Sequence, residues 1–166
     1  MIILGIDPGL ATVGFGIIEK KADGTFVAID YGIISTPKTE NTAVRIAMIY
    51  DSITELIQKF KPSDIAIEEL FFNNNQKTVI SVAEARGAAL LAGIKNCGNL
   101  FEYTPLQIKQ ALTGQGRADK QQMQYMVKLV LKLTSIPKPD DAADALAVAI
   151  CHAQTNNTIT KNNNRI

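Results

Sequence analysis

The most constraining feature of this sequence is an apolar run that ends on an acid and a turn. Residues 1–6 (MIILGI) carry no charged side chain, and Asp7, Pro8 and Gly9 follow them directly. Such a run predicts a buried strand, and at its tip the removal of a carboxylate from water is unfavourable. One explanation is local, because Asp before Pro-Gly favours a turn. The alternative is that the charge holds a cation or a phosphate.

The segments that follow predict a mixed α/β sheet. Residues 12–20 and 25–36 are further β-type runs separated by the turn Ala22-Asp23-Gly24, so residues 1–36 are expected to form a three-stranded antiparallel meander. The later patterns predict helices and strands in the order helix 41–60, strand 64–68, helix 78–95, strand 100–104, a short helix from 105, helix 118–133 and helix 140–153. The expected fold is a five-stranded mixed sheet, three antiparallel strands and then two parallel ones, with helices on both faces.

Length and composition favour one domain in an intracellular protein. With 166 residues, of which 46% are hydrophobic and 20% charged, the chain is typical of a globular domain over residues 1–154. The polar tail 155–166 (TNNTITKNNNRI) is expected to be disordered. No signal peptide or membrane span is expected. Cys97 and Cys151 have no metal-ligand spacing, so reduced thiols in a cytoplasmic protein are expected.

Charge is distributed unevenly along the chain. The formal net charge is +1, but residues 1–85 carry 7 basic and 11 acidic side chains, whereas residues 86–138 carry 8 basic and 2 acidic ones. An acidic cluster beside a basic stretch suits a site that holds cations and contacts phosphates. Chance segregation of surface charge is the alternative.

Three further acids are placed to join Asp7. Glu68 ends the apolar strand 64–68, and the carboxyl ends of neighbouring parallel strands meet at one edge of a sheet. Asp141 and Asp144 are three residues apart, which places them on one face of a helix with Cβ atoms about 5–6 Å apart. Four carboxylates suit Mg²⁺ or Mn²⁺, and a pair of such ions can hydrolyse a phosphodiester.

Each of these acids also has an ordinary local explanation. Asp7 could form a turn, Glu68 could end a strand at the surface, and an acid at 140 or 141 could cap a helix. The metal hypothesis accounts for all of them together and is favoured for that reason. His152, the one histidine, lies two or more turns beyond Asp144, so packing or surface exposure is expected for it.

Four segments together resemble the RuvC family of Holliday-junction resolvases in order and spacing. They are GIDPGLATVGFGII, AIEELFF, FEYTPLQIKQALTGQGRADKQQMQYMV and DDAADALAVAICHA. The resemblance covers residues 1–154 and implies an RNase H-like fold and a homodimer that binds a four-way DNA junction. It also implies symmetric nicking of two opposing strands with Mg²⁺ or Mn²⁺, two ions per active site, leaving 5′-phosphate and 3′-hydroxyl ends in recombination and repair.

The resemblance assigns the catalytic and metal-binding roles to Asp7, Glu68, Asp141 and Asp144. Glu68 rather than its neighbour Glu69 follows Ala-Ile directly, and the pair 141/144 reproduces the Asp-x-x-Asp spacing. Asp140 is therefore expected to be the helix cap.

Several residues match family positions that contact DNA. Lys109 in QIKQ and Lys120 in ADKQQ are expected near the scissile phosphate, and Arg117 could assist them. Phe71, or its neighbour Phe72, matches an aromatic that stacks on an unpaired base at the junction, for about 1–3 kcal/mol; burial in the core is the alternative. Residues 73–77 are a further candidate for contacts with the DNA strand.

Other functions are compatible with parts of the pattern. GIDPGLATVGFG also resembles the start of sugar kinases and actin-like ATPases, but those proteins need a second similar domain. A related nuclease that processes ribosomal RNA, or a junction-binding scaffold without chemistry, are further alternatives. The Ala-rich helix at 78–95 is the expected dimer interface, and branch-migration proteins of the RuvA and RuvB type are candidate partners.

Overall fold

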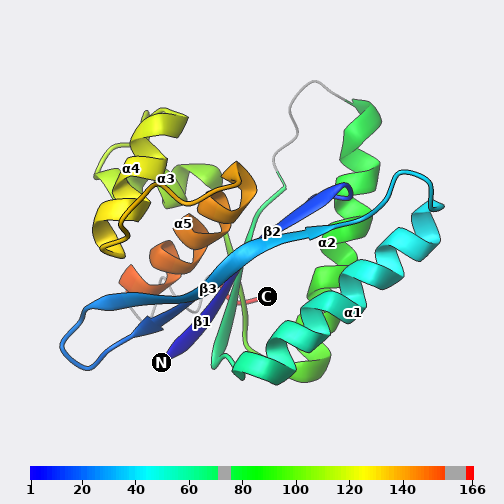
Figure 1. Cartoon of the computed structure of the whole chain (residues 1–166), viewed down its shortest axis with the longest axis horizontal. Coiled ribbons are helices and arrows are strands. Elements are labelled where there is room, and N and C mark those ends of the chain that lie inside the picture. Colours follow the sequence, from blue (N-terminus) through cyan, green and yellow to red (C-terminus); the bar gives the residue numbers. More distant parts are fainter. Residues whose placement is uncertain (71–75, 156–163) are drawn as a thin grey trace.

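The computed structural model describes residues 1–70, 76–155 and 164–166 (Figure 1). The elements are β1 (Ile2–Asp7), β2 (Thr12–Lys20), β3 (Phe26–Ser35), α1 (Thr42–Phe60), β4 (Asp64–Glu68), α2 (Gln76–Asn96), β5 (Leu100–Tyr103), α3 (Pro105–Thr113), α4 (Lys120–Val130) and α5 (Asp140–Gln154). The expected α/β fold is confirmed, with element boundaries within about three residues of those predicted.

The strand order places the two strand-ending acids side by side. The five strands lie in the order β3-β2-β1-β4-β5, with β1–β2 and β2–β3 antiparallel and β1–β4 and β4–β5 parallel. Ile6 of β1 pairs with Ile67 of β4, so the next residue of each strand is Asp7 or Glu68. The predicted meander and the parallel pairing of these two strands are therefore both confirmed.

Alternation along the strands divides the core into two layers. Leu4, Ile6, Ile65 and Ile67 face α1 and α2, whereas Ile3 and Ala66 belong to the cluster on the face of α3, α4 and α5. Figure 1 shows these two helix groups on opposite sides of the sheet. Since side chains alternate along a strand, Asp7 shares its face with Ile3, and Glu68 shares its face with Ala66. Both acids therefore lie on the α5 side of the sheet.

Helix α5 lies unusually close to the sheet because glycines face it. A Cβ atom at Gly5 or Gly14 would overlap the backbone carbonyl oxygen of Ala145 or Asp141, and one at Gly16 would meet the backbone of Leu146. The helix also presents small side chains to the sheet. These are Ala142, Ala145 and Ala149, which are completely buried. The glycines in β1 and β2 thus allow a helix backbone, rather than long side chains, to rest on the sheet.

The helix ends correct one prediction. Thr104 and Asp119 form capping boxes at the starts of α3 and α4, which is why α4 begins at Lys120 and not at 118. At the start of α5 the N-cap position is occupied by Pro139, not by Asp140 as expected. Asp140 stands one residue further on, where its carboxylate accepts a hydrogen bond from Lys138 Nζ (3.0 Å) instead of capping the helix.

The end of the chain also differs from expectation. Of the tail for which disorder was predicted, residues 164–166 lie beside β5, where Arg165 forms an antiparallel bridge with Phe101. Glu102 N donates to Asn164 O (2.7 Å), and Ile166 N donates to Leu100 O (3.0 Å). The free edge of β5 explains this pairing, because unpaired strand groups accept a further segment. Residues 156–163 lie outside the described part.

In the described ranges, no helix has the length and apolar character needed to cross a lipid bilayer.

A methyl group at Gly14 is expected to push α5 away from the sheet. Gly14→Ala should lower the free energy of unfolding by about 3 kcal/mol, at the upper end of the range for overpacking, since it meets backbone and not a flexible side chain. Urea titration measures this change. Ser35→Thr, which adds one methyl to an exposed site on β3, is the control and should leave stability unchanged. Equal stability of both variants would contradict the close packing.

Candidate functional site

Asp7 and Glu68 form an interacting pair of carboxyl groups at the tips of β1 and β4. Burial and the neighbouring Glu68, Asp144 and Asp141 raise the pKa of Asp7 to about 8. Burial and the charge of Asp144 raise the pKa of Glu68 to about 7, opposed by a hydrogen bond with Asp7. A hydrogen bond between two carboxyl groups requires a proton on one of them. Without a cation, this pair therefore retains a proton near neutral pH.

The first turns of α5 bring the other two predicted acids to the same place. Asp7 pairs with Gly14 across the β1–β2 ladder, and the backbone of Asp141 rests directly over Gly14. Asp141 and Asp144 both act electrostatically on Asp7. Burial raises the pKa of Asp144, and Lys120 partly opposes that rise. The four predicted acids therefore lie close enough to one another to interact electrostatically.

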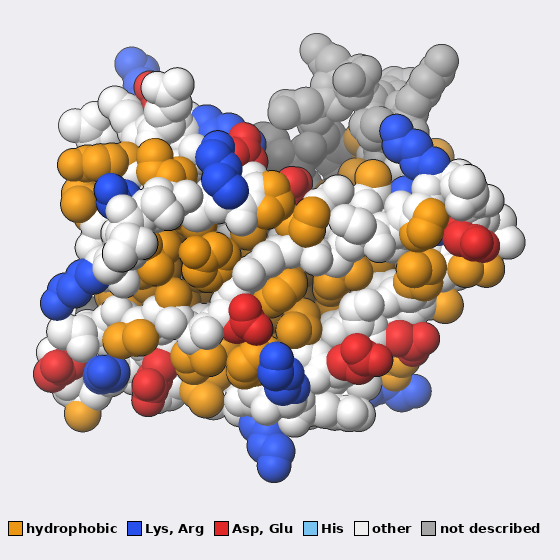
Figure 2. Space-filling view, in the orientation of Figure 1, with side chains coloured by type: hydrophobic (Ala, Val, Ile, Leu, Met, Phe, Trp, Pro, Cys, Tyr) orange, Lys and Arg blue, Asp and Glu red, His pale blue; other side chains and the backbone are white. Residues whose placement is uncertain are grey.

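The two predicted lysines lie beside these acids. A cleft of about 300 Å³ is lined by residues from β4, α3, α4 and α5: Glu68, Pro105, Ile108, Lys109, Lys120, Met123, Asp144 and Ala147. Lys120 Nζ lies 3.4 Å from Asp144 Oδ2 and 3.3 Å from Asp140 Oδ2. Lys109 favours the charged form of Glu68. Figure 2 shows acidic and basic side chains next to one another over the N-terminal end of α5.

Asp140 differs electrostatically from Asp7, Glu68 and Asp144. A hydrogen bond from Lys138, with others from Gln124 and Lys120, lowers its pKa to about 2. It is thus fully ionised at neutral pH and already has cationic partners. Asp7, Glu68 and Asp144 instead have raised pKa values. Asp140 still neighbours this group, because it shares Lys120 with Asp144.

The remaining candidate DNA-contacting residues either lie away from the cleft or fall outside the described residues. Arg117 is exposed in the segment between α3 and α4, and it is not among the residues that line the cleft. Phe71, Phe72 and residues 73–75 lie outside the described residues. Gln76 and Lys77 begin α2, without a description of their side chains.

The carboxylates fit a divalent cation chemically, although they are not a closed cage. Among the described residues, no three His, Cys, Asp or Glu side chains already surround a common point. The cluster nevertheless consists of hard oxygen donors, which Mg²⁺ and Mn²⁺ prefer. A cation would also offset the burial and repulsion that raise the pKa values of Asp7 and Glu68. The cluster is thus open to ligands from a substrate as well as from the protein.

A second polar group lies at the opposite end of β4 and was not anticipated. Of the two environments expected for His152, packing in the interior is the one observed. Its ring also hydrogen-bonds to Asp64 and to the hydroxyl of Tyr103. The sequence signal was present, since Asp64 opens an apolar strand just as Glu68 closes it. Sequence spacing alone does not show that a residue on α5 meets it.

Comparison with known proteins identifies the family. Residues 3–152 match the sequence profile of the family described as "Crossover junction endodeoxyribonuclease RuvC". The chain belongs to the RuvC family. It is 55% identical over 157 residues to the crossover junction endodeoxyribonuclease RuvC of Alkaliphilus oremlandii, covering 95% of each chain. Membership of this nuclease family suggests a divalent metal cofactor.

Two solved RuvC structures have the same fold. The Thermus thermophilus RuvC structure superposes with a TM-score of 0.86 at 32% identity, covering 99% of this chain and 98% of that chain. A structure of T. thermophilus RuvC in complex with a Holliday junction substrate gives a TM-score of 0.84 at 30% identity, covering 93% and 94% of the two chains. The predicted RNase H-like architecture of this RuvC chain is thereby confirmed.

Neutralising Asp7 is expected to stabilise the metal-free protein at alkaline pH. A carboxyl group with a folded-state pKa near 8 and an ordinary value of 3.8 contributes stability in acid that is lost as the pH rises through 8. In EDTA, Asp7→Asn should therefore melt higher than the wild type by more than about 2 °C at pH 8.5, as a difference above about 1 kcal/mol predicts for a chain of this length. The gap should be smaller at pH 5.

Thermal unfolding with and without Mg²⁺ completes this test. Mg²⁺ at pH 8.5 should raise the melting temperature of the wild type, because it binds the folded state, and should raise that of Asp7→Asn less. A variant that melts below the wild type at both pH values would contradict the electrostatic description of the site.

Proposed function

We propose that this chain resolves four-way (Holliday) DNA junctions by nicking two opposing strands, in homologous recombination and DNA repair. The observation that carries the proposal is a cleft at the carboxyl end of β4 that is lined by Glu68, Asp144, Lys109 and Lys120. Asp7 and Asp141 interact electrostatically with these acids. An acidic cluster that can hold cations, beside lysines that can bind phosphates, suits metal-assisted phosphodiester hydrolysis. The names of the relatives and the junction-bound relative support the same substrate.

Asp7, Glu68, Asp141 and Asp144 would hold the divalent ions, with Mg²⁺ as the physiological metal, Mn²⁺ as a substitute and two ions per site. When bound, such ions supply an activated water and stabilise the leaving oxygen. The protein's part is to keep the carboxylates ionised and converging. The expected products carry 5′-phosphate and 3′-hydroxyl ends.

Lys109 and Lys120 would bind the scissile phosphate. Lys109 of α3 and Lys120 of α4 both line the cleft. The side chain of Lys120 is 57% exposed, so it can turn from Asp144 toward DNA. The carboxylates raise the pKa of Lys120 against the opposing effect of burial, which keeps it charged. Arg117 would contact the DNA backbone further out, and Phe71 or Phe72 would stack on an unpaired base.

A homodimer would present two such sites to the two opposing strands. Helix α2 carries exposed apolar side chains at Ile80 (69%), Leu91 (49%) and Ile94 (53%), which share one helical face. Exposed apolar faces of this kind mark protein contacts, so α2 is the proposed dimer interface. Proteins of the RuvA and RuvB type are the proposed partners for branch migration.

A nicking assay with a mobile four-way junction tests the proposal. The wild type should nick the junction in Mg²⁺ and not in EDTA, and should leave a linear duplex of matched sequence intact. Glu68→Gln should lower the rate at least about 100-fold, because it removes a cation ligand, while the neighbouring Glu69→Gln is the matched control and should nick normally.

The outcomes separate the proposal from its alternatives. Tight junction binding without nicks in any divalent metal would overturn it and leave a scaffold. Faster cleavage of structured RNA than of the DNA junction would favour an RNA nuclease. Equal loss in Glu68→Gln and Glu69→Gln would contradict the assigned cluster.

Charges on the α2 face are expected to break the dimer. Leu91→Asp with Ile94→Asp should convert the protein to a monomer, since both side chains are exposed in one chain and would be buried between two. Light scattering after size exclusion measures the mass. The variant should keep its fold by circular dichroism but lose simultaneous nicking of both strands. A dimer that survives both changes would place the interface elsewhere.

A further inference from the structure

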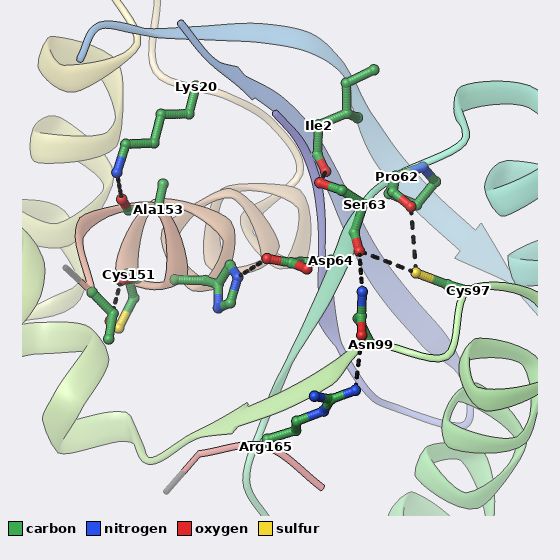
Figure 3. A network of polar contacts seen from close by, with 12 residues as sticks. Ile2, Lys20, Pro62, Ser63, Asp64, Cys97, Asn99, Cys151, Ala153 and Arg165 are labelled. Atoms are coloured by element: carbon green, nitrogen blue, oxygen red, sulfur yellow. Dashed lines mark hydrogen bonds and ion pairs between the residues drawn. The ribbon is translucent and has the colours of Figure 1, made fainter. Parts of the chain in front are cut away.

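A buried polar group connects the C-terminal half of α5 to the sheet. His152 Nε2 lies 2.9 Å from Asp64 Oδ2, and His152 Nδ1 lies 2.7 Å from the hydroxyl of Tyr103. His152 is 1% and Asp64 6% exposed. Lys20 of β2 also donates to the carbonyl of Ala153. Figure 3 shows Asp64 and Lys20 both directed toward the last part of α5.

These bonds differ in kind from the rest of the α5–sheet contact. Along most of the helix, alanines rest on the glycines of β1 and β2. Such contacts are apolar and non-directional, and the larger buried side chains of α5, such as Leu146 and Ile150, add further packing of the same kind. A hydrogen bond loses strength steeply with distance and angle. The bonds of His152 and Lys20 therefore add directional contacts that favour one position of α5 along its axis.

The positions of these residues match the spacing of the acidic cluster. Asp64 and Glu68 are the first and last residues of β4, and four residues of strand span about 13 Å. Asp144 and His152 both lie on α5, and eight residues of helix span about 12 Å. Asp64 meets His152 at one end, and Glu68 interacts with Asp144 at the other. The two segments thus have similar lengths, and they interact with each other at both ends.

We propose that His152 and Asp64 are positioning residues, which fix the axial register of α5 against β4 and so hold Asp141 and Asp144 at the correct distance from Asp7 and Glu68. Both are buried at the opposite end of β4 from Glu68, so the proposal gives them no contact with substrate or metal. The assignment rests on the proposed function, because its consequence is the affinity of the acidic cluster for divalent cations. The contact of His152 with Asp64 would thus act on the acids at the opposite end of α5.

The test separates register from stability by removing the bond in two ways. His152→Phe keeps a ring of similar size but removes the bond and leaves Asp64 buried without this partner. His152→Phe combined with Asp64→Leu replaces the histidine and the carboxylate by apolar side chains, which restores stability in many proteins. Adding Tyr103→Phe removes the hydroxyl that otherwise loses its bond with Nδ1. None of these forms retains the directional bond. Asp64→Asn is the rescue variant, since its amide oxygen can still accept from Nε2–H.

Two measurements are made on each full-length variant. One is the Mg²⁺ concentration that gives the half-maximal single-turnover nicking rate on a four-way junction. The other is the rise in melting temperature on adding Mg²⁺ at pH 8.5, which needs no activity. The packing control is Cys151→Ala, which truncates the buried neighbour of His152 and should lower the melting temperature without changing either Mg²⁺ response.

The proposal expects the double variant to need at least about tenfold more Mg²⁺, the lower end of effects from residues that orient metal ligands. It also expects a smaller Mg²⁺-induced rise in melting temperature, even where stability in EDTA equals that of the wild type. Asp64→Asn should respond nearly as the wild type does. A stable double variant with wild-type Mg²⁺ responses would overturn the proposal and leave a purely structural role.

Failure of the proposed function would look different. A wild type that never nicks the junction would refute the resolvase assignment, and the thermal response to Mg²⁺ would still decide the role of His152 and Asp64. If His152→Phe does not fold, the double variant and Asp64→Asn supply the same comparison.

Discussion

The close contact between the backbone of α5 and strands β1 and β2 is the constraint on which the rest of this structure depends. Gly5, Gly14 and Gly16 leave no side chain between helix and sheet, so the first turn of α5 rests against β2 directly beside Asp7. A longer residue at any of these positions would lift the helix and separate Asp141 and Asp144 from the strand-end acids. These glycines therefore set the distance between α5 and the strands at the candidate site.

The same contact produces an electrostatic problem that defines the site. Carboxyl groups from β1, β4 and α5 are brought together in a partly buried place, where burial and mutual repulsion raise the pKa values of Asp7 and Glu68 to about 8 and about 7. Lys109 and Lys120 offset this rise in pKa only in part. Both line the cleft together with Glu68 and Asp144. A site of this kind is less stable without cations than with them, which links metal binding to folding stability.

The acids at the two ends of β4 differ in how their charge is compensated. At its start, Asp64 has a direct partner in His152 and is almost fully enclosed. At its end, Glu68 faces other acids beside an open cleft. A satisfied buried pair suits a fixed joint, whereas an unsatisfied cluster at the surface suits ligand binding. One strand and one helix thus carry both the rigid joint and the proposed chemistry.

The sequence by itself determined the element order, the mixed sheet and the identity of the clustered acids, because these follow from short-range patterns: apolar runs, turn residues and the three-residue spacing of Asp141 and Asp144. Tertiary structure alone decided what depends on distant segments. Asp140 was predicted to cap α5, but Pro139 occupies the N-cap position. The pairing of residues 164–166 with β5 was not predicted, since an edge pairing depends on neighbours in space. The meeting of His152 with Asp64 joins residues 88 positions apart, and no local pattern encodes such a contact.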